Sequence, residues 1–126
     1  LEWQFKLSSG KPQMVAVFAN NASNLDFSTA NSAITAAKHV ITGTFDTTQS
    51  FGTRAHVFVD GASVAETQSS AGSDGTISDT AATLTIGFLP AATGISVISY
   101  IYAYKSVHNS STVSANYSWI HNTKGW

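Results

Sequence analysis

The sequence predicts an all-β protein of antiparallel strands, with one short helix near its C-terminal end. Three observations predict this class. Residues 1–7 alternate strictly between apolar and polar side chains, which is typical of a half-buried strand. The pair Asp60-Gly61 stands between two runs of β-forming residues and favours a tight hairpin, because both central residues of such a turn need positive φ. At residues 110–120 the apolar spacing changes to that of a helix.

The first third of the chain predicts strands separated by polar connections. In the first strand Leu1, Trp3, Phe5 and Leu7 share one face. Residues 8–12, Ser-Ser-Gly-Lys-Pro, are typical of a turn. The expected strands of this region are residues 1–7, residues 14–18 and a short strand within residues 25–32, after which residues 33–38 form a connection.

The middle of the chain predicts three short strands in a row, followed later by two more. The three are residues 39–46, 54–59 and 62–67, and the last two are joined at Asp60-Gly61. A polar loop, a strand over residues 83–87 and a turn at Pro90 follow. The longest strand signal is residues 95–104, where Ile98, Tyr100, Tyr102 and Tyr104 share one face.

The C-terminal segment predicts a short helix packed as a satellite on the sheets. Val113, Tyr117 and Ile120 fall on one helical stripe, and a Ser or Thr opens the segment as the N-cap. Residues 121–126 are expected to form a tail.

Composition bounds the function. The 126 residues are expected to form one domain, and a net charge of −1 gives no electrostatic case for nucleic acid. No apolar run approaches the roughly 20 residues that span a bilayer. The absence of cysteine excludes disulfides, cysteine–zinc sites and thiol nucleophiles. Charged residues make up 10% of the chain and Ser and Thr 33 of 126, so its surface is weakly protected against association. Such a surface is expected to lie against other subunits or under glycan, or to belong to a β-rich extracellular or virion protein.

Several segments of the sequence follow one another in an order that is typical of a known family of domains. They are His39-Val-Ile-Thr-Gly-Thr-Phe-Asp46, Val57-Phe-Val-Asp-Gly61, Leu84-Thr-Ile-Gly87, residues 94–102 and Ser111-Thr-Val-Ser-Ala-Asn-Tyr117, preceded by a hairpin of residues 3–7 and 14–18. This order resembles the C-terminal part of laminin-G-like domains, in the concanavalin-A-like lectin family. The resemblance implies an antiparallel jelly-roll β-sandwich over residues 1–126, used for binding or assembly.

The chain departs from this family in two ways. The acidic residue and the arginine of the family's penultimate strand are replaced by serine, tyrosine or isoleucine at residues 96–101. Several strands that the family places before the first strand are also missing. We expect the chain to be a piece of a longer protein, to receive these strands from another subunit, or to be a reduced sandwich. Open strand edges invite pairing.

Two ligand classes follow from the resemblance. Carbohydrate binding needs aromatic faces, and Tyr100, Tyr102 and Tyr104 would form such a platform; as an alternative they are core or interface residues. Calcium is the possible cofactor, with Asp74 and Asp79 as candidate ligands in a polar loop that could equally be a plain turn. The four histidines lack metal-ligand spacing.

Catalysis is not expected. Retaining glycosidases need two neighbouring carboxylates, whereas Glu2 and Glu66 are far apart in sequence and the acidic run of the enzymes with this fold is missing. Three Asn-x-Ser sequons, at Asn21, Asn109 and Asn116, are candidate glycosylation sites if the protein enters a glycosylating pathway. The sequence therefore favours a structural or adhesive module of an extracellular or virion surface assembly that associates with itself or with neighbouring subunits. The alternative is a monomeric carbohydrate-binding module.

Overall fold

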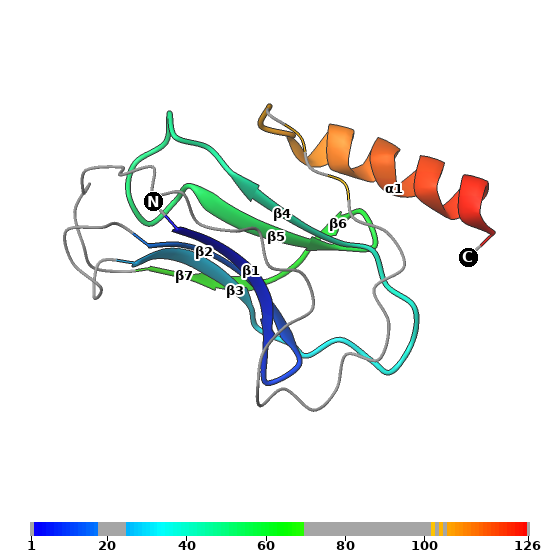
Figure 1. Cartoon of the computed structure of the whole chain (residues 1–126), viewed down its shortest axis with the longest axis horizontal. Helices are drawn as coiled ribbons and strands as arrows, with labels where there is room; N and C mark the ends of the chain where they lie inside the picture. The colour runs from blue at the N-terminus through cyan, green and yellow to red at the C-terminus, as the bar shows by residue number, and fades with distance from the viewer. Residues whose placement is uncertain (1, 18–24, 70–101, 103, 105, 126) are drawn as a thin grey trace.

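A computed structural model describes residues 2–17, 25–69, 102, 104 and 106–125 of the chain. These residues form two antiparallel β-sheets and one C-terminal helix (Figure 1). The mostly β class with a C-terminal helix is thus confirmed, whereas the jelly-roll form of the sandwich stays a prediction.

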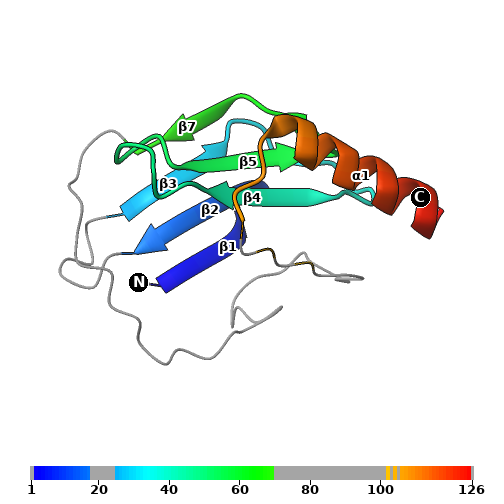
Figure 2. The same ribbon diagram turned by 90° about the horizontal axis from the view of Figure 1, so that it is seen from above.

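The first sheet has four strands in the order β1-β2-β3-β7, which Figure 2 shows side by side. Their bounds are Glu2–Ser8 for β1, Lys11–Val17 for β2, Leu25–Ala30 for β3 and Glu66–Gln68 for β7. All neighbouring pairs are antiparallel. The expected short strand within residues 25–32 is therefore confirmed as β3.

The turn between β1 and β2 is shorter than the sequence predicts. Only Ser9 and Gly10 form it, both at positive φ, whereas Ser8 and Pro12 belong to strands. The sequence predicted a turn over residues 8–12, which includes Pro12, a residue without a backbone N–H. Here Pro12 pairs with Leu7, one position beyond the Ser8–Lys11 pair that closes the turn. Pairs of antiparallel strands are hydrogen-bonded only at alternate positions, and at this position a backbone N–H does not bond to β1. The pairing of β2 with β3 begins only at Gln13, so the missing N–H leaves no gap in the ladder.

The second sheet has three strands in the order β4-β5-β6. Their bounds are Ile41–Phe45, Ala55–Val59 and Ala62–Ser63. The predicted hairpin turn is confirmed, since Asp60 has φ 52° and Gly61 has φ 75° between the paired Val59 and Ala62. Local residue chemistry alone specified this turn.

The single strand predicted over residues 62–67 is wrong. The chain leaves β5 after Ser63 and joins the other sheet at Glu66, where β7 pairs with β3. Residues 64 and 65 carry the chain from one sheet to the other. The alternation of apolar and polar residues breaks at this step, since Val64 and Ala65 are both apolar, but the break does not show which strand the following residues pair with.

The core lies between the two sheets. Ala16 and Ala30 of the first sheet and Ala55 and Val57 of the second are almost fully buried, and β2 and β3 contact β5. At Gly43 of β4 a Cβ atom would lie 3.0 Å from both the Met14 sulfur and the Phe5 ring. The sheets therefore approach closely there, and Phe5 turns inward as the alternation predicts, although 49% of it stays exposed.

The helix α1 spans Ser110–Lys124 and lies beside the three-stranded sheet, on the side away from the four-stranded one (Figure 1). The prediction was wrong at both of its ends. The N-cap is Asn109, whose side chain accepts a hydrogen bond from the Thr112 N–H, and the expected tail continues the helix to Lys124. Gly125 ends it in the left-handed conformation that commonly closes helices. Only Val113 and Ile120 of the helix are buried.

The helix contacts the β5–β6 turn at one glycine. A Cβ atom added to Gly61 would lie 2.6 Å from the Cβ of Tyr117, so no larger residue fits beneath the helix. Gly125 has a similar φ of 67°, but nothing lies within 4 Å of an added Cβ there. The two glycines therefore share one backbone conformation and differ in their surroundings.

We expect Gly61→Ala to lower the free energy of unfolding by about 2–4 kcal/mol, because strain at positive φ adds to the clash with Tyr117. Gly125→Ala is the matched control and should cost only about 1–2 kcal/mol, the strain alone. Urea denaturation of both variants measures the difference. Equal losses would contradict the close contact between the turn and α1.

Candidate functional site

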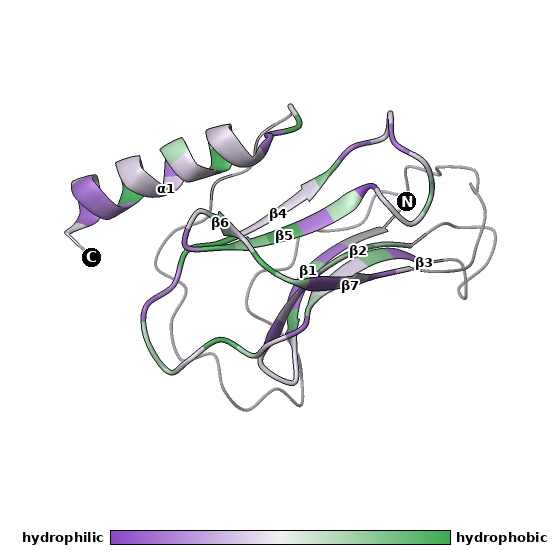
Figure 3. Cartoon of the chain, turned by 180° about the vertical axis from the view of Figure 1, so that it is seen from behind, coloured by the Kyte–Doolittle hydropathy of each residue, from purple (hydrophilic) through white to green (hydrophobic). Residues whose placement is uncertain are grey.

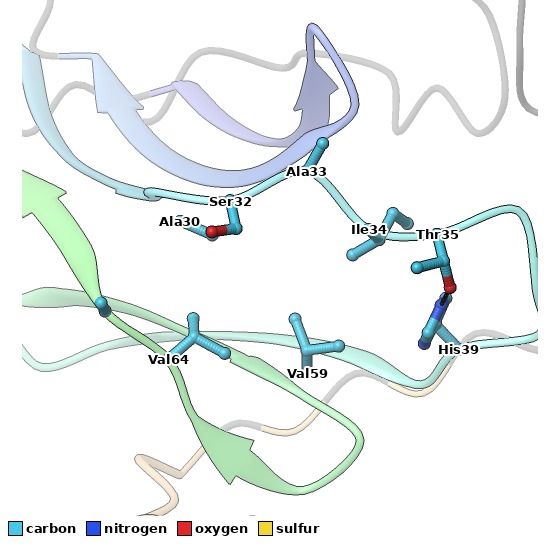
Figure 4. A pocket seen from close by; sticks show the side chains of 9 residues that line it. Ala30, Ser32, Ala33, Ile34, Thr35, His39, Val59 and Val64 are labelled. Carbon is cyan, nitrogen blue, oxygen red and sulfur yellow. Dashed lines mark hydrogen bonds between the residues drawn. The ribbon is translucent and has the colours of Figure 1, made fainter.

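A pocket of about 380 Å³ opens between the connection after β3 and the chain around the β5–β6 hairpin (Figure 4). Its lining residues are Ala30, Ser32, Ala33, Ile34, Thr35, His39, Val59, Val64 and Ala65. Two backbone hydrogen bonds tie its walls to the sheets. The Asn31 N–H donates to the Ala65 carbonyl at 2.8 Å, and the Ile34 N–H donates to the Gly10 carbonyl at 3.0 Å. The pocket is therefore held by the fold.

A chain of hydrogen bonds borders the pocket at His39. Asp60 Oδ2 lies 2.8 Å from His39 Nδ1, and His39 Nε2 lies 2.9 Å from Thr35 Oγ1. A carboxylate only accepts hydrogen bonds, so the network assigns the proton to Nδ1. Nε2 of the neutral ring is then an acceptor, and the Thr35 hydroxyl donates to it.

The order carboxylate, imidazole, hydroxyl is also that of acyl-transfer triads. Such chemistry needs further donors aimed at the developing oxyanion. Three backbone N–H groups along this part of the chain already have partners: Ile34 donates to Gly10, Val40 to Asp60 Oδ1 and Asp60 to Val40. The network ties the residue 33–40 connection to the β5–β6 turn, and we assign it to holding the pocket rather than to catalysis.

A second candidate is the aromatic surface, which we define as Tyr102, Tyr104, Val107 and Trp119. Each of these side chains is more than 40% exposed, and Trp119 is 55% exposed. The rings of Tyr102 and Trp119 meet edge to face with centroids 6.2 Å apart, and Tyr104 packs on His108 at 4.4 Å. Large exposed apolar side chains that contact one another, as Tyr102 and Trp119 do, are typical of interaction sites.

The aromatic surface differs from the predicted platform of Tyr100, Tyr102 and Tyr104. Tyr102 and Tyr104 are exposed, but neither lies in a strand, so the strand predicted over residues 95–104 is wrong at its C-terminal end. Tyr100 and the rest of that segment, like the strand predicted over residues 83–87, lie outside the described residues. Trp119 was missed because its position on an exposed helical face gave no signal by itself.

The remaining predicted sites are only partly placed. Asn109 is exposed and lies in the irregular segment just before α1, where it is the N-cap of the helix. Asn116 is half-buried on the helix, with its Nδ2 3.1 Å from His108 Nδ1. Asn21 and the candidate calcium ligands Asp74 and Asp79 lie outside the described residues.

Glu66 joins the two sheets through a polar network that the sequence did not reveal. Its Oε2 accepts from the Ser28 hydroxyl at 2.5 Å and from the Val57 N–H at 3.1 Å, and its Oε1 lies 2.7 Å from His56 Nδ1. Strand β6 pairs with β5 only at Phe58 and Val59, so it offers no backbone partner to Val57. The Glu66 carboxylate accepts the hydrogen bond of the Val57 N–H instead. The hydrophilic β7, purple in Figure 3, thus supplies side-chain partners for the edge of the other sheet.

This network is structural. The Ser28 hydroxyl donates to Glu66 and not to His56, and Ser28 is fully buried, so no substrate reaches it. Gln68 extends the same role, since its Nε2 donates to the Ala55 carbonyl at 3.1 Å.

Asp26 of β3 forms a second polar link between the sheets. It is fully buried and accepts from the Gly52 N–H at 3.2 Å and from the Ser69 hydroxyl at 3.3 Å. Arg54 Nε lies 3.9 Å from its other oxygen and donates to the Gln49 carbonyl at 2.6 Å. The link fixes the β4–β5 loop against the first sheet.

The same loop holds Asp46, whose Oδ1 accepts hydrogen bonds from the hydroxyl and the backbone N–H of Thr48. These two bonds, the hydroxyl first, hold the pKa of the Asp46 carboxyl below its ordinary value. A lowered pKa stabilises the fold above the ordinary pKa of the group, and this contribution is lost as the pH falls through the folded-state value. Asp46 is half-buried and its partner Thr48 is exposed, so its effect stays local to the turn.

Neither metal-ligand geometry, nor helix length, nor similarity to known proteins assigns a function to these sites. Among the described residues no three His, Cys, Asp or Glu side chains are grouped so that they could hold a metal ion. In the same part of the chain, no helix has the length and apolar character needed to cross a membrane. Compared with known proteins, the chain matches no family model, no curated protein and no solved structure.

Proposed function

We propose that the protein is a structural or adhesive module of an extracellular or virion surface assembly, with a jelly-roll sandwich of the laminin-G type. Two antiparallel sheets joined by a strand crossover support this fold. The low charge content supports the assembly role, because few charges oppose contact between subunits. On this proposal its action is binding through a surface and not catalysis.

The aromatic surface is the observation that carries the proposal. Trp119 presents its ring to solvent on a helix that buries only two of its residues, and Tyr102, in the chain before the helix, is exposed beside it. Trp and Tyr supply most of the binding energy at many protein interfaces. The helix has no acidic residue in its first turn, and its basic residues, His121 and Lys124, lie at the far end. The aromatic surface is therefore the contact that the geometry favours for a neighbouring subunit.

Sedimentation equilibrium over a range of protein concentrations tests this function. We expect the wild-type chain to associate and Trp119→Ser to shift it toward the monomer, since the two residues have similar helix propensities and the site is exposed. Ser114→Ala, at another exposed position of α1, should leave association unchanged. A wild-type chain that stays monomeric at its highest soluble concentration would argue against self-association through this surface.

Carbohydrate binding is the second candidate. The perpendicular rings of Tyr102 and Trp119 are exposed, and Asn116 with its hydrogen-bonding partner His108 lies next to Tyr104. Aromatic faces beside amide and imidazole groups suit a sugar. A glycan array with the wild-type chain and Trp119→Ser separates the candidates: a lectin binds a defined glycan and loses it in the variant, whereas an assembly module gives no such signal.

A further inference from the structure

The polar end of the pocket offers hydrogen-bond acceptors. When the His39 ring carries its proton on Nδ1 alone, the Thr35 hydroxyl donates to His39 Nε2, and the lone pairs of Thr35 Oγ1 are left to accept. Asp60 holds His39 in place. Its Oδ2 accepts from Nδ1 of the ring, and its Oδ1 accepts from the Val40 N–H. A group that enters here meets an oxygen acceptor whose orientation is already set.

The electrostatic character of the pocket follows from the same groups. His39 is neutral when Nδ1 donates to Asp60 and Nε2 accepts from Thr35. Among the described residues, those that line the pocket include no Lys or Arg, and the Asp60 carboxylate stands behind the ring. An anionic ligand would therefore meet a negative charge that no described lining residue offsets.

The body of the pocket is apolar. Apart from its polar end and Ser32, it is lined by Ala30, Ala33, Ile34, Val59, Val64 and Ala65. In Figure 4 Val64 lies across the opening from Ala30 and Ser32, Val59 lies across it from Ile34, and Thr35 and His39 stand together at one end. Its volume of about 380 Å³ lies at the lower end of the range for small-molecule sites, roughly 300–1,000 Å³.

We propose that this pocket binds a small neutral molecule with a short aliphatic body and a hydroxyl head group that donates a hydrogen bond to Thr35 Oγ1. The aliphatic part lies against the valines and Ile34, and the hydroxyl reaches the polar end. The site is separate from the aromatic surface, and the inference does not rest on the function proposed above.

Methyl NMR titration with n-hexanol tests the site, with n-hexanoate as the charged analogue. We expect n-hexanol to shift the methyl signals of Ile34, Val59 and Val64 in a saturable way. Hexanoate should bind more than about tenfold more weakly because its carboxylate approaches Asp60. Thr35→Val keeps the shape of the side chain and should weaken n-hexanol binding about fivefold. Thr47→Val, at an exposed threonine outside the pocket, is the matched control and should bind as the wild type does.

A second variant keeps the test informative if Thr35→Val perturbs the connection. Ser32→Leu adds bulk at an exposed position that lines the pocket, and it should abolish the saturable shifts without changing the remaining spectrum. The proposal is overturned if n-hexanol causes no saturable shift in these three residues of the wild-type chain. It is also overturned if hexanoate binds as tightly as n-hexanol, or if both variants bind n-hexanol as well as Thr47→Val does.

Discussion

Glu66→Leu is expected to lower the free energy of unfolding by about 4 kcal/mol. The substitution leaves the buried Ser28 hydroxyl and the Val57 N–H without their acceptor, and each buried group that loses its partner costs about 1–3 kcal/mol. Glu66→Gln keeps one acceptor oxygen and should cost about 1 kcal/mol. Urea denaturation, with the midpoint shifted and the slope unchanged, measures both.

A double-mutant cycle isolates this contact. Ser28→Ala removes the buried donor, so combining it with Glu66→Leu should cost less than the sum of the two single losses by about 1 kcal/mol or more. Strictly additive losses would show that Glu66 does not link β7 to Ser28.

Asp26→Leu is expected to destabilise the protein by about 3–5 kcal/mol, because it leaves the mostly buried Arg54 guanidinium without the neighbouring carboxylate. The Gly52 N–H and the Ser69 hydroxyl lose their acceptor at the same time. The same denaturation experiment measures the loss.

The control is the double variant Asp26→Leu/Arg54→Met. Replacing both members of a buried ion pair by apolar residues is often tolerated, so the double variant should be more stable than Asp26→Leu alone. If the double variant is less stable than either single variant, then Arg54 is held mainly by other groups, such as the Gln49 carbonyl.

The sequence predicted those parts of the fold that depend on neighbouring residues. The Asp60-Gly61 turn follows from the tolerance of these two residues for positive φ, and the inward face of β1 follows from strict alternation. The existence of α1 followed from its period, but its cap did not, because Ser110 and Asn109 are both good N-cap residues and only the backbone geometry distinguishes them.

The parts that could not be predicted depend on pairing between distant segments. The alternation in residues 62–67 breaks at Val64 and Ala65, but this break does not identify the new partner, because β7 pairs with the distant strand β3. Glu66 resembles an ordinary polar residue of a strand until the register places it between Ser28 and Val57. The pocket at Thr35 and His39 likewise depends on the crossover, which brings Val64 and Ala65 to the connection after β3.

The crossover also sets the order in which the chain can be completed during synthesis. Strands β1, β2 and β3 are made first, but the partner that covers the outer edge of β3 is β7, which follows the whole second sheet. Until residue 68 is made, that edge offers free backbone groups to any neighbouring chain. Asp26 and Ser28 sit on β3 with their side chains turned inward, and an inward-pointing charge makes a strand edge a poor template for aggregation. The polar residues that later join the sheets therefore also protect the nascent chain against aggregation until β7 is made.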